Sequence, residues 1–216
     1  YGDGYAGIGV WRAAFKPLVD RIADTDIRLQ WFCCDRSTGV TDASGNRITL
    51  IRDTQSPVAV EYQAVKFIGT GRDNIKAGVF SGWELGDYIY LRSEEAYMIK
   101  MEALAHKSSA EAVTELNSFM KTRQPDYNYT FTNKADLIEE IIYQKRVEFW
   151  GEGLEYIDNR RLNIPVDRTD ETWGAENNNH FSAGKFRYNQ EDRPFLYQLP
   201  LSEIENNSQL SPSDQN

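Results

Sequence analysis

Three carboxylates near a pair of glycines have the residue types and spacing that could support chemistry. Glu148, Glu152 and Asp158 lie close together in the chain, and helical spacing could bring the first two onto one face. A glycoside hydrolase needs two carboxyl groups about 5–5.5 Å apart for retention, or about 6.5–9.5 Å for inversion. Cations occupy the same stretch: Lys145, Arg146, Arg160 and Arg161. We therefore favour an internal ion network that fixes a helix junction over a catalytic pair.

Other catalytic and metal-binding arrangements have little support in the sequence. His106 and His180 are the two histidines, and neither has a partner at a metal-ligand spacing such as His-x-x-x-His. The Gly-x-Ser-x-Gly elbow of many serine hydrolases does not occur. The glycines from Gly69 to Gly86 match neither a P-loop nor a dinucleotide fingerprint. We expect no metal, no cofactor and no catalytic residue.

Tryptophans offer a better argument for binding than for catalysis. An indole ring can cover the flat C–H face of a pyranose while polar neighbours bond its hydroxyl groups. Trp83 and Trp173 lie in Gly- or Asn-containing segments, and Trp11 and Trp31 lie near segment ends. Large apolar side chains are more often buried than exposed to a ligand. These four residues are the predicted ligand-binding set, and Trp150 is assigned to the core.

Periodic apolar residues predict the helices that would position these side chains. A helix from about Tyr88 to Ala105 is followed by one from Ser108 to about Arg123, where Ser108-Ser-Ala-Glu111 predicts a capping box. This hairpin approaches the tetratricopeptide period of about 34 residues. Asn133 is a good N-cap for a third helix, which Gly151 and Gly153 interrupt. The helix then resumes from Leu154 to Arg161.

The rest of the chain predicts short elements and long irregular loops. Phe15–Ala23 predicts a short helix, and Asp26–Asp35 reads as an extended run. Further β-prone pieces are predicted at these positions: Arg47–Arg52, Glu61–Ile68, Lys185–Tyr188 and Phe195–Leu199. The adjacent Cys33 and Cys34 are expected to be two buried free thiols in a strand, because a vicinal disulfide is strained.

Charge and hydropathy exclude several classes of partner. The 216 residues include 33 acidic and 24 basic side chains, for a formal net charge of -9. Such a balance repels phosphate backbones and anionic lipid head groups, so nucleic acid is an improbable partner. The sequence contains no apolar run of the roughly 20 residues that span a bilayer. The chain opens at Tyr1 without an initiator Met, and we expect it to be part of something longer.

The helical region resembles the SusD/RagB family of nutrient-binding lipoproteins. Leu91-Arg-Ser-Glu-Glu-Ala-Tyr97 and Ala112-Val-Thr-Glu-Leu-Asn117, with Arg123 further on, match the two helices that precede the family signature. The signature Glu-Arg-Arg-x-Glu-Phe-x-x-Glu-Gly-x-Arg-x-x-Asp-x-x-Arg is matched by Arg146, Glu148, Phe149, Glu152, Gly153, Asp158 and Arg161. Departures occur at Gln144, Lys145 and Glu155. Weaker landmarks are Asp26-Ile-Arg28, Lys66-Phe67 and the closing segment Phe195–Ile204.

The resemblance implies a non-enzymatic glycan-binding protein. Family members are lipid-anchored on the extracellular face of the Bacteroidetes outer membrane and deliver an oligosaccharide or polysaccharide to a SusC-like TonB-dependent transporter, as in starch uptake. The lipid anchor would lie outside this chain. The signature residues themselves would be structural, and the main sugar platform of the family lies largely upstream of them.

The predicted fold is mainly α, with a tetratricopeptide-like hairpin, further helices, long irregular loops and a few short β-strands. We expect a loop-rich segment at 1–86, the helical signature region at 87–162 and an irregular segment at 163–216. All three would belong to one C-terminal SusD-like domain. The alternative functions are a helical-repeat protein-interaction module and, with less support, a glycoside hydrolase.

Overall fold

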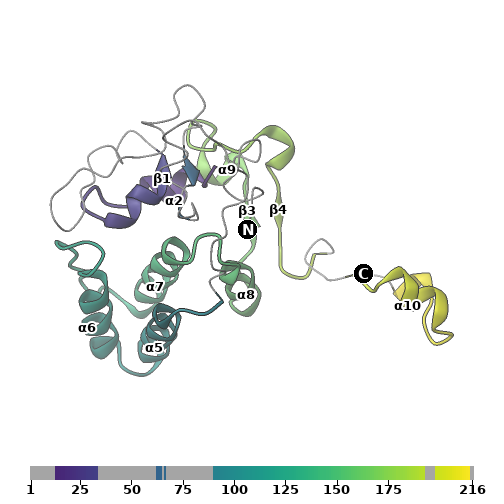
Figure 1. Ribbon diagram of the computed structural model, residues 1–216, viewed down its shortest axis with the longest axis horizontal. Helices are drawn as coiled ribbons and strands as arrows, with labels where there is room; N and C mark the ends of the chain where they lie inside the picture. Colours follow the sequence, from purple (N-terminus) through teal and green to yellow (C-terminus); the bar gives the residue numbers. More distant parts are fainter. Residues whose placement is uncertain (1–12, 34–61, 65, 67–89, 193–197, 215–216) are drawn as a thin grey trace, which may run out of the picture. The chain divides into compact units, whose positions relative to one another are not determined.

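The computed structural model describes residues 13–33, 62–64, 66, 90–192 and 198–214. The chain divides into two compact units, Tyr1–Glu152 and Gly153–Asn216. The described part is mainly helical and contains two short two-stranded sheets (Figure 1). The predicted mainly α fold class is therefore confirmed. The predicted three-segment division stays a prediction, and its first boundary lies outside the described residues.

Three helices are the longest elements in the described part of the first unit. They are α5 (Ser93–Lys107), α6 (Ser109–Met120) and α7 (Lys134–Glu148), and α5 packs against both others (Figure 1). Their apolar residues fall three or four apart, so each helix presents one stripe to its neighbours. The largest fully buried apolar side chains here are Met98, Met101, Leu116, Met120, Leu137 and Ile141.

A second group of buried residues joins the N-terminal elements to α7. These elements are α2 (Lys16–Asp20), the 3₁₀ helix η1 (Ile27–Trp31) and the strands β1 (Phe32–Cys33) and β2 (Gln63–Ala64). The strands pair antiparallel, with Phe32 opposite Ala64. The core cluster comprises Ala14, Val19, Ile22, Leu29, Phe32, Tyr62, Ala64, Tyr143 and Val147.

The extended run predicted from Asp26 is wrong for its first half. The Asp26 carboxylate accepts a hydrogen bond from the Arg28 backbone N–H (2.8 Å) and caps η1 instead. Arg28 is 1% exposed, and its guanidinium is paired with Asp26 and Glu148 rather than directed to solvent. The prediction for Arg47–Arg52 and the state of Cys34 lie outside the described residues.

Two predictions about the helical hairpin also require correction. Helix α5 begins at Ser93 rather than near Tyr88, and Leu91, which lies within the predicted helix, is 71% exposed. The predicted capping box at Ser108 does not form, because the Ser108 side chain makes no capping hydrogen bond. Ser108 is the single residue between α5 and α6, and its N–H still donates to Leu104 O (2.6 Å). This one-residue connection leaves the side chain out of the capping position.

The ends of α7 follow the sequence signals. The Asn133 side chain accepts a hydrogen bond from Asp136 N (3.0 Å), which confirms the predicted N-cap. After Glu148 the backbone takes positive φ at Gly151 (78°) and Gly153 (87°). Glycine adopts these angles without the Cβ clash that other residues suffer, so the pair ends α7 and allows the chain to change direction.

The described part of the second unit consists of short helices and one two-stranded sheet. It contains α8 (Leu154–Arg161), as predicted, and a two-stranded antiparallel sheet in which Val166 pairs with Tyr188. Its elements are α8, β3 (Val166–Asp167), α9 (Asp170–Trp173), η3 (Ser182–Gly184), β4 (Arg187–Tyr188), α10 (Leu201–Asn206) and η5 (Pro212–Asp214). Strand β4 lies within the β-prone piece at Lys185–Tyr188. Most of the piece at Phe195–Leu199 lies outside the described residues.

The two N-caps provide a matched test of these local interactions. Asn133→Ala should lower the free energy of unfolding by about 1 kcal/mol, because it removes the acceptor for a backbone N–H at the start of α7. Ser108→Ala should change it by less than about 0.5 kcal/mol, because that side chain makes no capping hydrogen bond. Urea unfolding of both variants measures the difference. Equal losses would show that the capping geometry described here is wrong.

Candidate functional site

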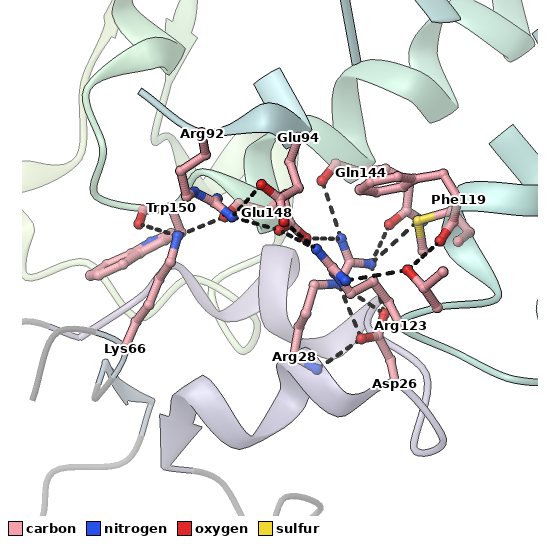
Figure 2. A network of polar contacts seen from close by, with 12 residues as sticks. Asp26, Arg28, Lys66, Arg92, Glu94, Phe119, Arg123, Gln144, Glu148 and Trp150 are labelled. Atoms are coloured by element: carbon pink, nitrogen blue, oxygen red, sulfur yellow. Dashed lines mark hydrogen bonds and ion pairs between the residues drawn. The ribbon is translucent and has the colours of Figure 1, made fainter. Parts of the chain in front are cut away.

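A cluster of ionic side chains surrounds Glu148 at the end of α7. Its carboxylate is 1% exposed and contacts three guanidinium groups (Figure 2). Arg92 Nη1 lies 3.0 Å from Oε1, Arg123 Nη2 lies 3.1 Å from Oε1, and Arg28 Nη1 lies 3.5 Å from Oε2. Arg92 precedes α5, Arg123 follows α6 and Arg28 belongs to η1. One carboxylate therefore connects four segments that are distant in sequence.

Arg28 is held by a further set of acceptors on the buried side of this cluster. Its Nη2 lies 2.7 Å from Asp26 Oδ2 and its Nε lies 3.1 Å from Asp26 Oδ1, while Gln144 accepts through both its side chain and its backbone carbonyl. Asp26 is 2% exposed. A buried guanidinium is tolerable only when its donors find such acceptors. Gln144 replaces the glutamate usual in the family signature and still binds Arg28 through its side-chain oxygen.

Glu152 and Lys66 extend the cluster beyond the end of α7. Lys66 Nζ donates to Glu148 O (2.6 Å) and to Trp150 O (3.2 Å), and it pairs with the Glu152 carboxylate. Arg92 approaches the same carboxylate through Nη2 (2.8 Å) and Nε (3.0 Å). Burial lowers the pKa of Lys66, although the Glu152 carboxylate opposes that effect. These contacts hold the segment that contains Gly151.

The charges in the cluster balance. Among the described residues, four cations (Arg28, Lys66, Arg92 and Arg123) face four anions (Asp26, Glu94, Glu148 and Glu152). Buried charges are costly unless they are paired and hydrogen-bonded, and this arrangement meets both conditions. Within the described residues the cluster is thus a set of balanced, paired charges that joins η1, α5, α6 and α7.

The environment of Glu148 does not provide a general acid. Burial acts to raise the pKa of Glu148, but the hydrogen bonds and charges of Arg123, Arg28 and Arg92 outweigh burial and place the pKa below its ordinary value. A glycosidase acid requires a raised pKa and access to the glycosidic oxygen. Glu148 has neither property in the described part of the chain. The ion-network interpretation therefore describes Glu148 and Glu152 better than the catalytic-pair interpretation.

The partners of that network differ from those we predicted. We expected the neighbouring cations Lys145, Arg146, Arg160 and Arg161 to supply it. Glu148 and Glu152 pair instead with cations far away in the sequence, because α7 packs against those segments. One short-range pair among the described residues is as expected: in the second unit Arg161 Nε donates to Asp158 Oδ1 (2.8 Å).

The sequence did carry a signal for the true partners. Asp26, Arg28 and Lys66 are weak family landmarks, and Arg92 and Arg123 lie within or just after the matched helix patterns. The pattern shows which residues the family shares, but it does not reveal that they meet around one carboxylate.

The predicted tryptophan set is only partly described. Trp11 and Trp83 lie outside the described residues. Trp31 is the last residue of η1, is half-buried against the core, and carries Lys66 Nζ 4.7 Å above its ring centroid. Trp173 ends α9 in the second unit and is 37% exposed. Ligand binding by all four residues stays a prediction.

Within the described ranges, no group of three or more His, Cys, Asp or Glu side chains is placed to hold a metal ion. No helix there is long and apolar enough to cross a membrane.

Comparison with known proteins assigns the chain to a family. The model of the SusD family matches residues 62–216, which is more than half of the chain. The chain therefore belongs to the SusD family. Proteins of this family bind carbohydrates for nutrient uptake, are generally non-catalytic, are typically associated with the outer membrane and generally work with SusC-like transporters. Searches of curated proteins and of solved structures gave no match.

Removal of the central carboxylate should destabilise the first unit strongly. Glu148→Gln keeps the side-chain shape but leaves Arg28, Arg92 and Arg123 short of one negative charge. We expect a loss of about 3–5 kcal/mol in the free energy of unfolding, as for other broken buried pairs. The matched control is Glu139→Gln on the same helix, where the side chain is 75% exposed and the loss should stay below about 0.5 kcal/mol.

The same carboxylate should contribute to acid sensitivity. Because the pKa of Glu148 in the folded protein lies below 4.5, its ordinary value, the folded state binds fewer protons there than the unfolded state. The stabilisation is complete above pH 4.5 and is lost as the pH falls through the folded pKa. Denaturation at a series of acidic pH values should show a shallower decline for Glu148→Gln than for the wild type. If the stability of both proteins falls equally with pH, Glu148 is not a cause of the acid sensitivity.

Proposed function

We propose that this protein captures an oligosaccharide or polysaccharide at the extracellular face of the outer membrane and delivers it to a SusC-like TonB-dependent transporter without cleaving it. The observation that carries the proposal is the family match over residues 62–216. Glu148 was the strongest candidate for a catalytic acid, and its carboxylate is buried and paired with arginines. This state supports the proposal that the protein binds its ligand without cleaving it. In this proposal the ion network is scaffold, and the ligand binds elsewhere.

Trp173 is the described residue of the predicted set that best suits contact with a sugar. Its indole Nε1 donates to Asp167 O (2.9 Å), which fixes the ring at one edge. The Asp167 carboxylate in turn accepts from Thr169 N (3.0 Å), Thr169 Oγ1 (2.7 Å) and Thr172 Oγ1 (2.7 Å), and it pairs with Arg187. A half-exposed indole held in this way costs little conformational entropy on binding.

The neighbouring polar residues support the same proposal. Asn178 is buried and donates to Arg168 O (3.0 Å) and to Asp170 Oδ1 (2.8 Å), so it orders the loop that follows α9. Lys185 Nζ also contacts Asp170 (2.7 Å). A rigid loop beside an indole is a suitable support for hydrogen bonds to sugar hydroxyls. Trp31 is less suitable, because Lys66 covers one face of its ring.

A protein-interaction role is the second candidate, and one observation favours it. Tyr97 and Ile99 on α5, with Leu91 and Tyr90 before it, are between 51% and 91% exposed. Exposed apolar side chains of this kind can pack against a protein partner. This candidate predicts that a protein partner, and no sugar, is bound.

Mutation of Trp173 tests the proposed contact. A glycan array should identify ligands of the wild-type protein, and calorimetry should measure their dissociation constants. Trp173→Ala should weaken binding by about 1 kcal/mol or more, which is roughly fivefold in Kd, because it removes the stacking surface.

The control for this experiment is Tyr90→Ala, which removes an aromatic side chain that is 91% exposed in the first unit. It should leave Kd unchanged. Unchanged binding by Trp173→Ala would remove this residue from the site. Absence of any glycan ligand for the wild type would reject the carbohydrate proposal in favour of the interaction role.

A further inference from the structure

A cavity of about 420 Å³ opens in the first unit beside the ionic cluster, and Asp26 and Gln144 belong to both. Its walls come from the segment after α2, the loop between α6 and α7, and one face of α7. The volume lies within the range of about 300–1,000 Å³ that is usual for small-molecule sites. The lining residues are Arg21, Ile22, Ala23, Asp26, Gln124, Asp126, Tyr127, Asn128, Tyr129, Glu140, Tyr143 and Gln144.

Two of the three tyrosines in the wall, Tyr127 and Tyr143, are held in fixed positions. Tyr127 is 7% exposed and its hydroxyl donates to Glu140 Oε1 (2.9 Å), while Tyr143 is 8% exposed and its ring lies 3.9 Å below the Arg21 guanidinium. Burial raises the pKa of both phenols above its ordinary value, so both stay neutral. The Tyr127 hydroxyl is thus anchored, and the Arg21 guanidinium covers one face of the Tyr143 ring, so both rings are fixed in the cavity wall.

Planar polar groups of both kinds surround these rings. Gln124 and Asn128 bring amides that can donate and accept, and Glu140 brings acceptors that Arg21 (2.6 Å) and Gln144 (2.6 Å) hold in position. Two neighbouring hydroxyl groups on a sugar ring are best bound by a hydrogen-bond donor and an acceptor that lie side by side. Planar amide, carboxylate and guanidinium groups can place donors and acceptors in this way. The wall is thus suited to a polyhydroxylated ring.

The charges on the wall oppose an anionic ligand. Asp26 is paired with Arg28 and Glu140 with Arg21, so these two carboxylates are compensated within the protein. Asp126 accepts a hydrogen bond from the neutral hydroxyl of Thr25 (2.5 Å), and the hydrogen bonds of Thr25 and Gln124 lower the pKa of Asp126 below its ordinary value. Asp126 therefore adds negative charge to the opening, where it repels carboxylate and sulfate groups.

We propose that this cavity binds one neutral sugar residue and discriminates against acidic sugars. The inference rests on the proposed carbohydrate-binding function and adds a location and a charge preference to it. It requires neither Trp173 nor any part of the second unit. Removal of a hydrogen-bonding group from the cavity and removal of the Asp126 charge should therefore have separate and measurable effects.

The experiment titrates the wild-type chain with glucose, galactose, mannose and N-acetylglucosamine, and with glucuronate and galacturonate as acidic probes. Nuclear magnetic resonance should show shifts of the side-chain amide signals of Gln124 and Asn128 with the neutral sugars. Asn128→Ala, at an exposed loop position, should weaken neutral-sugar binding by about threefold to tenfold, the value of one hydrogen bond. Glu111→Gln, on α6 outside the cavity, is the control and should bind as the wild type does.

Asp126→Asn tests the charge preference, because it keeps the acceptor for Thr25 while removing the charge. The ratio of uronate affinity to neutral-sugar affinity should rise by about threefold or more. An unchanged ratio, or tighter binding of uronates by the wild type, would overturn the charge preference.

The remaining outcomes separate this inference from the proposed function. If neutral sugars bind but neither the amide signals nor the Asn128→Ala affinity changes, the cavity is not the site and the proposed function stands. If no sugar binds to the wild type on the array or in these titrations, the proposed function fails and the cavity inference fails with it.

Discussion

The buried carboxylate of Glu148 is the constraint on which the first unit depends. A single negative charge at 1% exposure would be prohibitive by itself, and three guanidinium groups from separate segments make it tolerable. Because each arginine must reach the same point, η1, the start of α5 and the end of α6 are fixed relative to α7. Apolar packing brings the helices together, but it is less directional than this ionic contact.

The same interaction explains why several local sequence rules fail. Arg92 turns toward Glu148 and Glu152, and α5 begins only after it, although the apolar pattern extends further upstream. Arg28 is buried among acceptors that include Glu148, and the Asp26 cap gives η1 in place of the predicted extended run. At Arg92 a long-range ion pair outweighs a local preference, since the latter amounts to only a fraction of a kcal/mol per residue.

Scaffold and ligand contact are separate tasks in this interpretation. In the first unit, the carboxylates of the family signature form internal ion pairs. Such a role is compatible with a binding protein that does not cleave its ligand. Surfaces available to a ligand lie elsewhere: the indole of Trp173 in the second unit, and the tyrosine-lined cavity beside α7 in the first. A rigid ionic scaffold can keep such surfaces pre-formed, which reduces the entropic cost of binding.

The sequence by itself determined the helical class, the Asn133 cap, the helix Leu154–Arg161 and the family, because these depend on local spacing and on motifs read along the chain. Only the tertiary structure decided which cation meets which carboxylate. Neighbours in sequence, such as Lys145 and Arg146, were the natural guess for Glu148, yet its partners come from three other segments. Sequence spacing specifies contacts within a helix turn, whereas ion pairs between elements depend on how those elements pack.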